Sequence, residues 1–306
     1  MSTLGNIIGN SNYTGSGKLA VYPAVDEYVY QDTRSVPTNL VSIDWTPDGH
    51  SMLGSLKIDR TVYNFTSTAS TDDYHINTRS VLHNYRYGFI PEIASGGSAW
   101  AARYIPNTSG VGGKQLLIAL SQGTSTNKIQ QYTMPFAYDL RQGNPPSSLG
   151  APLYPTYTPV SQGAYNCKSD TSANSMNGLN MSPDGTRLLA IFPTSFAYLA
   201  QWNLTVPYNV LGGMSWQTPV QLASGFGSYC LYVPPKGDYV YLGKAGVVQR
   251  HALSTPWDIS TFNATAESTL DISAQTAAAP LDIYATKSQL YVLVQSSLFE
   301  YEWAQP

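Results

Sequence analysis

Short apolar runs separated by turn residues recur along the whole chain, and several share one pattern. The pattern is an apolar residue, two residues that are mostly polar, a ring-bearing residue, any residue and an apolar residue. It occurs in IQQYTM (129–134), LAQWNL (199–204) and VQRHAL (248–253). Looser copies are VDEYVY (25–30), VYNFTS (62–67) and LFEYEW (298–303). Such short segments, rich in aromatic and β-branched residues, predict β-strands.

An aromatic turn follows the three best copies at a fixed distance. Tyr138, Tyr208 and Trp257 each lie six residues after the ring of their segment. The clearest example is LSTPWDIST (253–261), where proline and small polar residues break the strand and Asp258 supplies a turn oxygen. We interpret these residues as structural, with Trp257 filling the space between neighbouring blades and Asp258 holding the turn.

A second element precedes each ring-bearing segment and reads as a strand end, a tight turn and an apolar strand. Its copies are DWTPDGHSML (44–53), YIPNTSGVGGKQLLIAL (104–120), NMSPDGTRLL (180–189), YVPPKGDYVYLG (232–243) and DIYATKSQLYVLV (282–294). In the Pro-Asp-Gly turns, proline presets φ and glycine accepts a positive φ. The repeating unit is therefore strand, turn, strand, ring-bearing strand and aromatic turn.

Repeats of about 40 to 50 residues built from short strands predict an all-β fold, a single β-propeller. Six ring-bearing segments predict about six blades, with five or seven as alternatives. A segment near residues 18–30 is expected to close the ring as the outer strand of the last sheet. The predicted domains are an N-terminal arm at 1–17 and a propeller at 18–306 with long loops at 66–103 and 141–179.

Composition narrows the choice of partner. Only 11% of the 306 residues are charged, the formal net charge is −3, and there are 23 Tyr and 6 Trp. No cluster of Lys and Arg is present, which argues against nucleic acid as a partner. The first residues show no basic stretch followed by an apolar one, and no apolar run is long enough to span a membrane, so we expect synthesis in a cytoplasm without a signal peptide or membrane insertion.

No cofactor, metal site or catalytic set is predicted. The four histidines are not spaced as metal ligands, and His251 occupies the ring position of its repeat, which favours packing. Asp26-Glu27 and Asp72-Asp73 lack a calcium-loop pattern. Cys167 and Cys230 are expected to be reduced.

The long loops are the candidate ligand or partner contacts. They are rich in Tyr, Ser, Asn and Gly, a composition that binding loops use for rigid aromatic contacts and adaptable hydrogen bonds. The candidate residues are Tyr85, Tyr87, Tyr154 and Tyr157. Packing against neighbouring subunits is an equally good interpretation.

The combination of Pro-Asp-Gly turns with LSTPWDIST-like turns resembles β-propeller proteins encoded by tailed bacteriophages and some environmental bacteria. The match is sharp at 248–261 and fair at 129–140 and 199–210. The resemblance implies a virion-associated or adhesin-like repeat protein. It brings no catalytic motif.

We therefore expect a non-enzymatic viral structural protein in the virion, displayed on a tail fiber, spike or capsid surface and acting in host attachment. Its expected partners are other virion proteins, within an oligomer, and a host cell-surface glycan. Two alternatives stay open. One is a capsid or tail decoration or connector protein without a receptor role, and the other is a polysaccharide-acting propeller enzyme.

Overall fold

The structure is a computed structural model in which all described sheets are antiparallel. It describes residues 24–46, 51–57, 61–66, 86–89, 97–105, 114–122, 126–134, 137–138, 140, 159–167, 170, 175–193, 197–223 and 230–303. Two short 3-10 helices, η1 (Val25–Glu27) and η2 (Ile259–Thr261), accompany the strands. Among the described residues there is no helix of the length and hydrophobicity that crossing a membrane would require.

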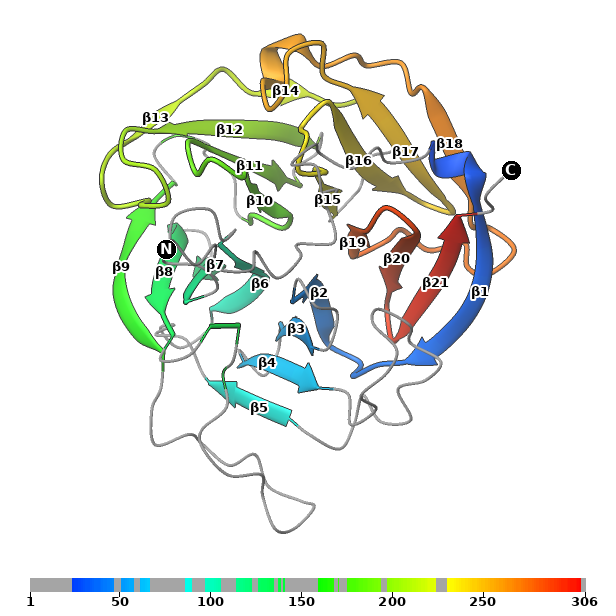
Figure 1. Ribbon diagram of the computed structural model, residues 1–306, viewed down its shortest axis with the longest axis horizontal. Coiled ribbons are helices and arrows are strands. Elements are labelled where there is room, and N and C mark those ends of the chain that lie inside the picture. Colours follow the sequence, from blue (N-terminus) through cyan, green and yellow to red (C-terminus); the bar gives the residue numbers. More distant parts are fainter. Residues whose placement is uncertain are drawn as a thin grey trace, which may run out of the picture.

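Five small sheets surround a common centre as the blades of a β-propeller (Figure 1). Blade 1 contains β2 (Leu40–Trp45), β3 (Ser51–Leu56), β4 (Thr61–Thr66) and β5 (Arg86–Phe89). Blade 2 contains β6 (Ser98–Tyr104), β7 (Gln115–Gln122), β8 (Thr126–Thr133) and β9 (Val160–Asn166). Blade 3 contains β10 (Leu179–Met181), β11 (Arg187–Phe192), β12 (Tyr198–Leu204) and β13 (Met214–Trp216), with β14 (Val220–Gln221) also paired to β12. Blade 4 contains β15 (Leu231–Tyr232), β16 (Tyr239–Lys244), β17 (Val247–Ala252) and β18 (Ser268–Asp271). Blade 5 contains β19 (Asp282–Ala285), β20 (Gln289–Val294), β21 (Ser297–Trp303) and β1 (Tyr28–Ser35).

The propeller prediction is confirmed, and the preferred count of six blades is corrected to five among the described residues. The count of six includes VDEYVY (25–30) as one of the six ring-bearing segments. In the structure this segment forms η1 and the start of β1, which belongs to blade 5. The long intervals at 66–103 and 141–179 contain the outer strands β5 and β9 of blades 1 and 2. Their lengths therefore reflect long connections within a blade.

The first and last described strands share blade 5. β1 runs antiparallel to β21, with Tyr28 opposite Trp303 and Ser35 opposite Ser297. The closing strand is predicted near residues 18–30, whereas β1 begins at Tyr28. Its role in the fold is the predicted one, because β1 is the outermost strand of the last sheet.

The aromatic turns of blades 3 and 4 each pack on the glycine of the preceding tight turn in the same blade. Trp257 and Tyr208 have φ values of +59° and +63°, a backbone conformation that residues other than glycine rarely adopt. A Cβ on Gly237 would lie 1.9 Å from Trp257 Cδ1, and one on Gly185 would lie 2.4 Å from Tyr208 Cδ1. Only glycine leaves room for the ring, so the two sequence motifs form one contact.

Hydrogen bonds reinforce this contact. The Trp257 backbone N donates to the Gly237 carbonyl at 2.8 Å, and its indole Nε1 donates to the Pro235 carbonyl at 3.1 Å. Asp258 Oδ1 accepts from the Ser260 backbone N at 3.0 Å and so caps η2. Trp257 also belongs to an apolar cluster that blades 3 and 4 share.

A polar side chain at the third position of the ring-bearing segment ties each of three blades to the next one. These side chains are Asn64, Gln131 and Gln201. Asn64 donates to the Tyr138 carbonyl at 3.2 Å, and Gln131 donates to the Tyr208 carbonyl at 3.0 Å. Gln201 accepts from the Ile259 backbone N at 3.0 Å. The aromatic turn of one blade is thus anchored by the strand of its predecessor.

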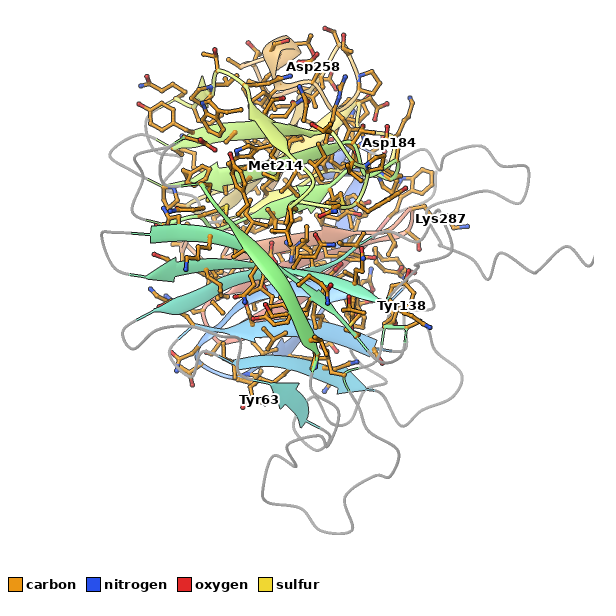
Figure 2. All side chains as sticks on the ribbon, turned by 90° about the vertical axis from the view of Figure 1, so that its left-hand side faces the viewer. Tyr63, Tyr138, Asp184, Met214, Asp258 and Lys287 are labelled. Carbon is orange, nitrogen blue, oxygen red and sulfur yellow. The ribbon has the colours of Figure 1, made fainter. Side chains whose placement is uncertain are left out.

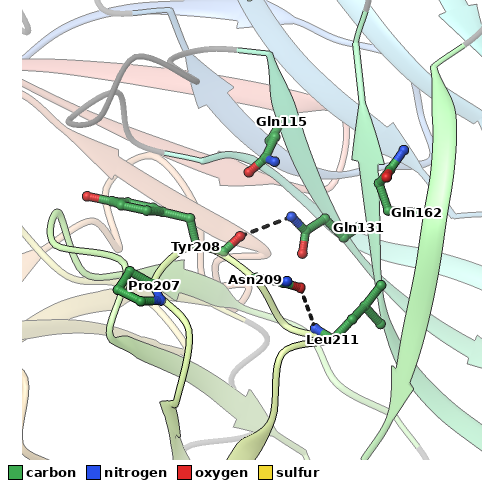
Figure 3. A pocket seen from close by; sticks show the side chains of 7 residues that line it. All are labelled: Gln115, Gln131, Gln162, Pro207, Tyr208, Asn209 and Leu211. Atoms are coloured by element: carbon green, nitrogen blue, oxygen red, sulfur yellow. Dashed lines mark hydrogen bonds between the residues drawn. The ribbon is translucent and has the colours of Figure 1, made fainter.

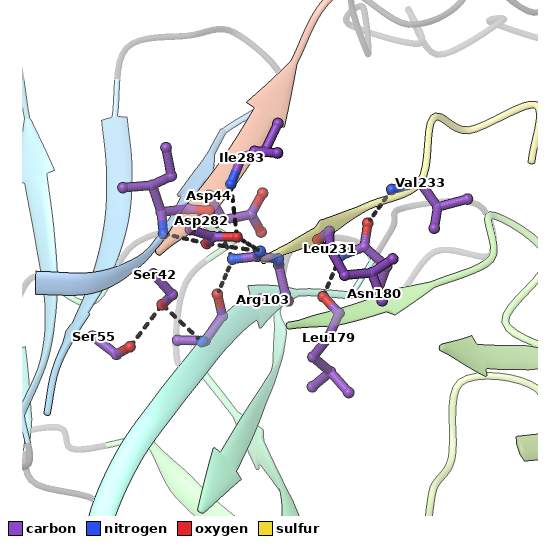
Figure 4. A network of polar contacts seen from close by, with 12 residues as sticks. Ser42, Asp44, Ser55, Arg103, Leu179, Asn180, Leu231, Val233, Asp282 and Ile283 are labelled. Atoms are coloured by element: carbon purple, nitrogen blue, oxygen red, sulfur yellow. Dashed lines mark hydrogen bonds and ion pairs between the residues drawn. The ribbon is translucent and has the colours of Figure 1, made fainter. Parts of the chain in front are cut away.

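A buried ion pair joins three blades near the centre of the propeller (Figure 4). Arg103 on β6 donates through Nη2 to both carboxylate oxygens of Asp282 on β19, at 2.7 and 2.8 Å. Its Nη1 donates to the Ile43 carbonyl on β2 at 2.7 Å, and the Ile43 backbone N donates to Asp282 Oδ2 at 2.8 Å. Both charged side chains are almost completely buried. Blades 1, 2 and 5 therefore share one satisfied polar network.

Equivalent innermost strands carry further ties between blades. Asn180 Oδ1 on β10 accepts from the Val233 backbone N at 2.8 Å, which joins blade 3 to blade 4. Tyr232 donates its hydroxyl to the Ala285 carbonyl at 2.6 Å, which joins blade 4 to blade 5. Asp44 joins blades 1 and 2, because its Oδ2 accepts from the Tyr104 backbone N at 2.8 Å.

Asp44 makes the stability of the fold depend on pH. Burial raises its pKa to about 7, an effect that the nearby Arg103 charge partly offsets and the Asp282 charge adds to. Between the usual value of 3.8 and about 7 the folded state holds a proton that the unfolded state releases. Its contribution to the free energy of unfolding therefore falls by about 1.4 kcal/mol per pH unit over this window as pH rises.

The variant Asp44→Asn is expected to remove this slope, because asparagine does not ionise. Chemical denaturation at a series of pH values measures it for both proteins. The difference between the two proteins reports the titration of Asp44 together with its coupling to the nearby Asp282. Parallel pH profiles would contradict the assignment.

Candidate functional site

A groove of about 380 Å³ lies between blades 2 and 3 (Figure 3). Its volume falls in the range typical of small-ligand sites. The lining residues are all uncharged and come from β7, β8, β9 and the connection between β12 and β13: Gln115, Gln131, Gln162, Pro207, Tyr208, Asn209 and Leu211.

The groove lies at the end of the propeller that carries the tight turns and the aromatic turns. Figure 2 shows Tyr138, Asp184 and Lys287, which belong to such turns in three blades, along one side of the molecule. Tyr208, the aromatic turn residue of blade 3, lines the groove. The repeated motif therefore also shapes this surface, although Tyr208 itself is mostly buried and its ring covers Gly185.

The blade 3 wall is a tight turn with a defined geometry. The Asn209 backbone N donates to the Val206 carbonyl at 3.2 Å, with Pro207 and then Tyr208 between them. Proline followed by a positive φ is the geometry of a type II turn. Asn209 Oδ1 then accepts from the Leu211 backbone N at 2.9 Å, so the side-chain oxygen is committed to the turn.

The blade 2 wall contains a β-bulge. Gln131 pairs with Gly163 and Tyr132 pairs with Ser161, which leaves Gln162 as the extra residue of β9. Gly163 has φ +132°, and a Cβ there would lie 3.0 Å from Leu211 Cδ1 of the opposite wall. Gln162 is exposed at the groove, on the same face of β9 as the exposed residues Val160, Ala164 and Asn166.

Gln131 holds the two walls together. Its Nε2 donates to the Tyr208 carbonyl at 3.0 Å, and its Oε1 accepts from the Val210 backbone N at 3.0 Å. Both ends of the amide are used within the fold. Gln131 is therefore a positioning residue of the groove.

Three other amides keep unused hydrogen-bonding capacity. Within the described part of the chain, Asn209 Nδ2 and Gln162 Oε1 make no hydrogen bond, while Gln162 Nε2 donates to the Val160 carbonyl at 3.4 Å. Gln115 Oε1 is buried without a partner. Rotation of that amide would exchange its oxygen and nitrogen, because terminal amide torsions are broad. The groove thus offers a donor at Asn209 and an acceptor at Gln162.

The predicted ligand-contact tyrosines are placed only in part. Tyr85, Tyr154 and Tyr157 lie outside the described residues. Tyr87 is in β5, where its backbone pairs with Asn64 of β4. The four tyrosines remain predicted contacts.

The other candidate groups have structural surroundings. The His251 ring stacks on Phe262 with centroids 5.0 Å apart, and its Nδ1 lies 3.0 Å from the Asn263 carbonyl oxygen. Cys167 and Cys230 are buried in blades 2 and 4 respectively, and no disulfide joins them. Within the segments that the structure describes, no three His, Cys, Asp or Glu side chains gather in a way that could hold a metal ion. Asp26 and Glu27 are exposed residues of η1, and Asp72 and Asp73 lie outside the described residues.

Comparison with known proteins gives no matching family model and no matching curated protein sequence.

Sequence patterns single out Tyr208 as a turn residue but do not reveal that it shares a groove with the other lining residues. Gln115, Gln162, Asn209 and Leu211 belong to three separate strands or turns, and only the packing of blade 2 against blade 3 brings them together. One signal was present: Gly163 lies inside a strand, where an isolated glycine indicates a bulge or a close approach of another chain segment.

Proposed function

We propose that this protein is a non-enzymatic, virion-associated β-propeller that attaches a bacteriophage to a neutral glycan on the host surface. The observation that carries the proposal is the groove between blades 2 and 3, whose seven lining residues are all uncharged and include four side-chain amides. Neutral amides exchange hydrogen bonds with hydroxyl groups in both directions, which is what a neutral sugar requires. A charged ligand would find no opposite charge among the lining residues.

The virion context is supported by the sequence resemblance to bacteriophage propellers. The residues that carry the resemblance, at 129–140, 199–210 and 248–261, include the aromatic turns that build the ties between blades. A ring of interlocked blades gives a rigid scaffold for surface contacts. Other virion proteins are the proposed partners in an oligomer, with the predicted loops at 66–103 and 141–179 as additional contact regions.

Immunogold labelling of candidate phage particles with an antibody against the purified chain tests this proposal. We expect gold at the tail tip, spike or fiber. Gold confined to the head would favour a decoration or connector protein without a receptor role. If no particle is labelled, the virion proposal is refuted. The polysaccharide-cleaving alternative would then be tested with a reducing-sugar assay.

A further inference from the structure

We propose that the groove between blades 2 and 3 is a binding site for a sugar that carries an acetamido group. This inference rests on the proposed function and specifies the ligand class of that same site. An acetamido group has a carbonyl oxygen, an N–H and a methyl. The groove offers Asn209 as a donor, Gln162 as an acceptor and Leu211 as an apolar contact.

The donor is Asn209. Its Oδ1 is held by the Leu211 backbone N, which fixes the orientation of the side-chain amide and leaves Nδ2 for another acceptor. Asn209 is half-buried in the wall of the groove (Figure 3). A fixed N–H donor in such a position suits the carbonyl oxygen of an acetamido group, because its geometry is set before the ligand arrives.

The acceptor is Gln162 at the β9 bulge. Its Nε2 is directed to the Val160 carbonyl, so Oε1 is the end that remains for a ligand N–H. The bulge leaves Gln162 as the extra residue between two backbone pairs, and its side chain is on the exposed face of β9. Gln115 also lines the groove, but its amide oxygen is buried and is not counted among the ligand contacts.

The apolar contact is Leu211. Its side chain rests on Gly163, and the residue is still 42% exposed, among the largest exposures of a large apolar residue in the described chain. The methyl of an acetamido group would cover part of this exposed surface. A hexose without this group has hydroxyl groups for the two amides but no methyl for Leu211. The acetamido sugar therefore buries more apolar surface in the groove.

A secondary amide also occurs in peptides, and the structure favours the sugar. The groove has a volume of about 380 Å³, is partly open to solvent, and is lined by amides from two blades. A peptide strand is usually recognised along an extended sheet edge through main-chain bonds.

Isothermal titration calorimetry and NMR titration of the full chain test the inference with three probes. They are N-acetylglucosamine, glucose and N-acetyl-alanine-N-methylamide, which represents a peptide. We expect N-acetylglucosamine to bind about tenfold or more tightly than either of the other probes, since one unmatched group corresponds to about a tenfold change. Equal affinity for glucose, equal affinity for the peptide probe or no binding of N-acetylglucosamine would each overturn the proposal.

Two substitutions locate the site, each with a matched control. Asn209→Asp keeps the oxygen that accepts from Leu211 but removes the donor, and Gln162→Leu removes the acceptor without changing the backbone. Asn263→Asp is the control for the first, because Asn263 Oδ1 accepts from the Thr265 backbone N in the same local arrangement outside the groove. Gln221→Leu, at an exposed strand position in β14, is the control for the second.

We expect both groove variants to weaken N-acetylglucosamine binding about tenfold and both controls to leave it unchanged. Thermal melting verifies that all four variants are folded. Groove variants that bind the sugar as wild type does would overturn the site. If the protein binds host cells while the groove variants retain full cell binding, this inference fails and the proposed function stands. If the sugar binds in the groove but the chain is found on no virion, the proposed function fails and the site stands.

Discussion

Replacing Arg103 with leucine is expected to lower the free energy of unfolding by about 3–5 kcal/mol, because the change leaves the buried Asp282 carboxylate without its partner. The loss is large because Arg103 also donates to the Ile43 carbonyl, so blades 1, 2 and 5 lose a common hydrogen-bond donor. Urea denaturation monitored by tryptophan fluorescence gives the measurement.

The control is Arg34→Gln, which removes a partly exposed ion pair between Arg34 Nε and Asp32 Oδ2 at 3.4 Å. Surface pairs of this kind contribute only about 0–1 kcal/mol. If Arg103→Leu and Arg34→Gln lowered the stability by the same small amount, the central network would not hold the blades together.

The second large loss of stability is expected when either Trp257 or Gly237 is replaced. Trp257→Ala should cost about 3–5 kcal/mol, because it removes a large buried ring and leaves the Pro235 carbonyl without its donor. Gly237→Ala should cost roughly 2–4 kcal/mol, since the new methyl meets the indole and φ at this residue is +74°.

The double variant shows whether the two motifs act through direct contact. Without the indole, Gly237→Ala should cost only the backbone strain of about 1–2 kcal/mol. The two single effects are therefore expected to sum to more than the double effect, as chemical denaturation of all four proteins would show. Strict additivity would contradict the contact between tight turn and aromatic turn.

Local chemistry explains which parts of the fold could be predicted from the sequence. Pro-Asp-Gly turns and the fixed six-residue offset between ring and aromatic turn are short-range patterns, and Gly185 and Trp257 adopt the conformations that such turns require. The blade count depended instead on which sheet VDEYVY joins. That pairing, between β1 and β21, connects the two ends of the described chain and leaves no local signature.

The polar ties and the groove could not be predicted for the same reason. Gln131 looks like an ordinary strand residue until the turn of the next blade is placed beside it. Arg103 and Asp282 are 179 positions apart in the sequence, and only closure of the propeller brings them within 2.7 Å. Sequence periodicity reports the faces of a strand, whereas these contacts depend on how blades are arranged.

The most direct test of attachment to a neutral glycan is to measure binding of the purified protein to an array of bacterial surface polysaccharides at low and high salt. Recognition through uncharged amides predicts binding to neutral, acetamido-containing polysaccharides that is unchanged by salt, because screening weakens only interactions between charges. Binding confined to anionic polysaccharides and abolished by salt, or no binding to any polysaccharide, would contradict it.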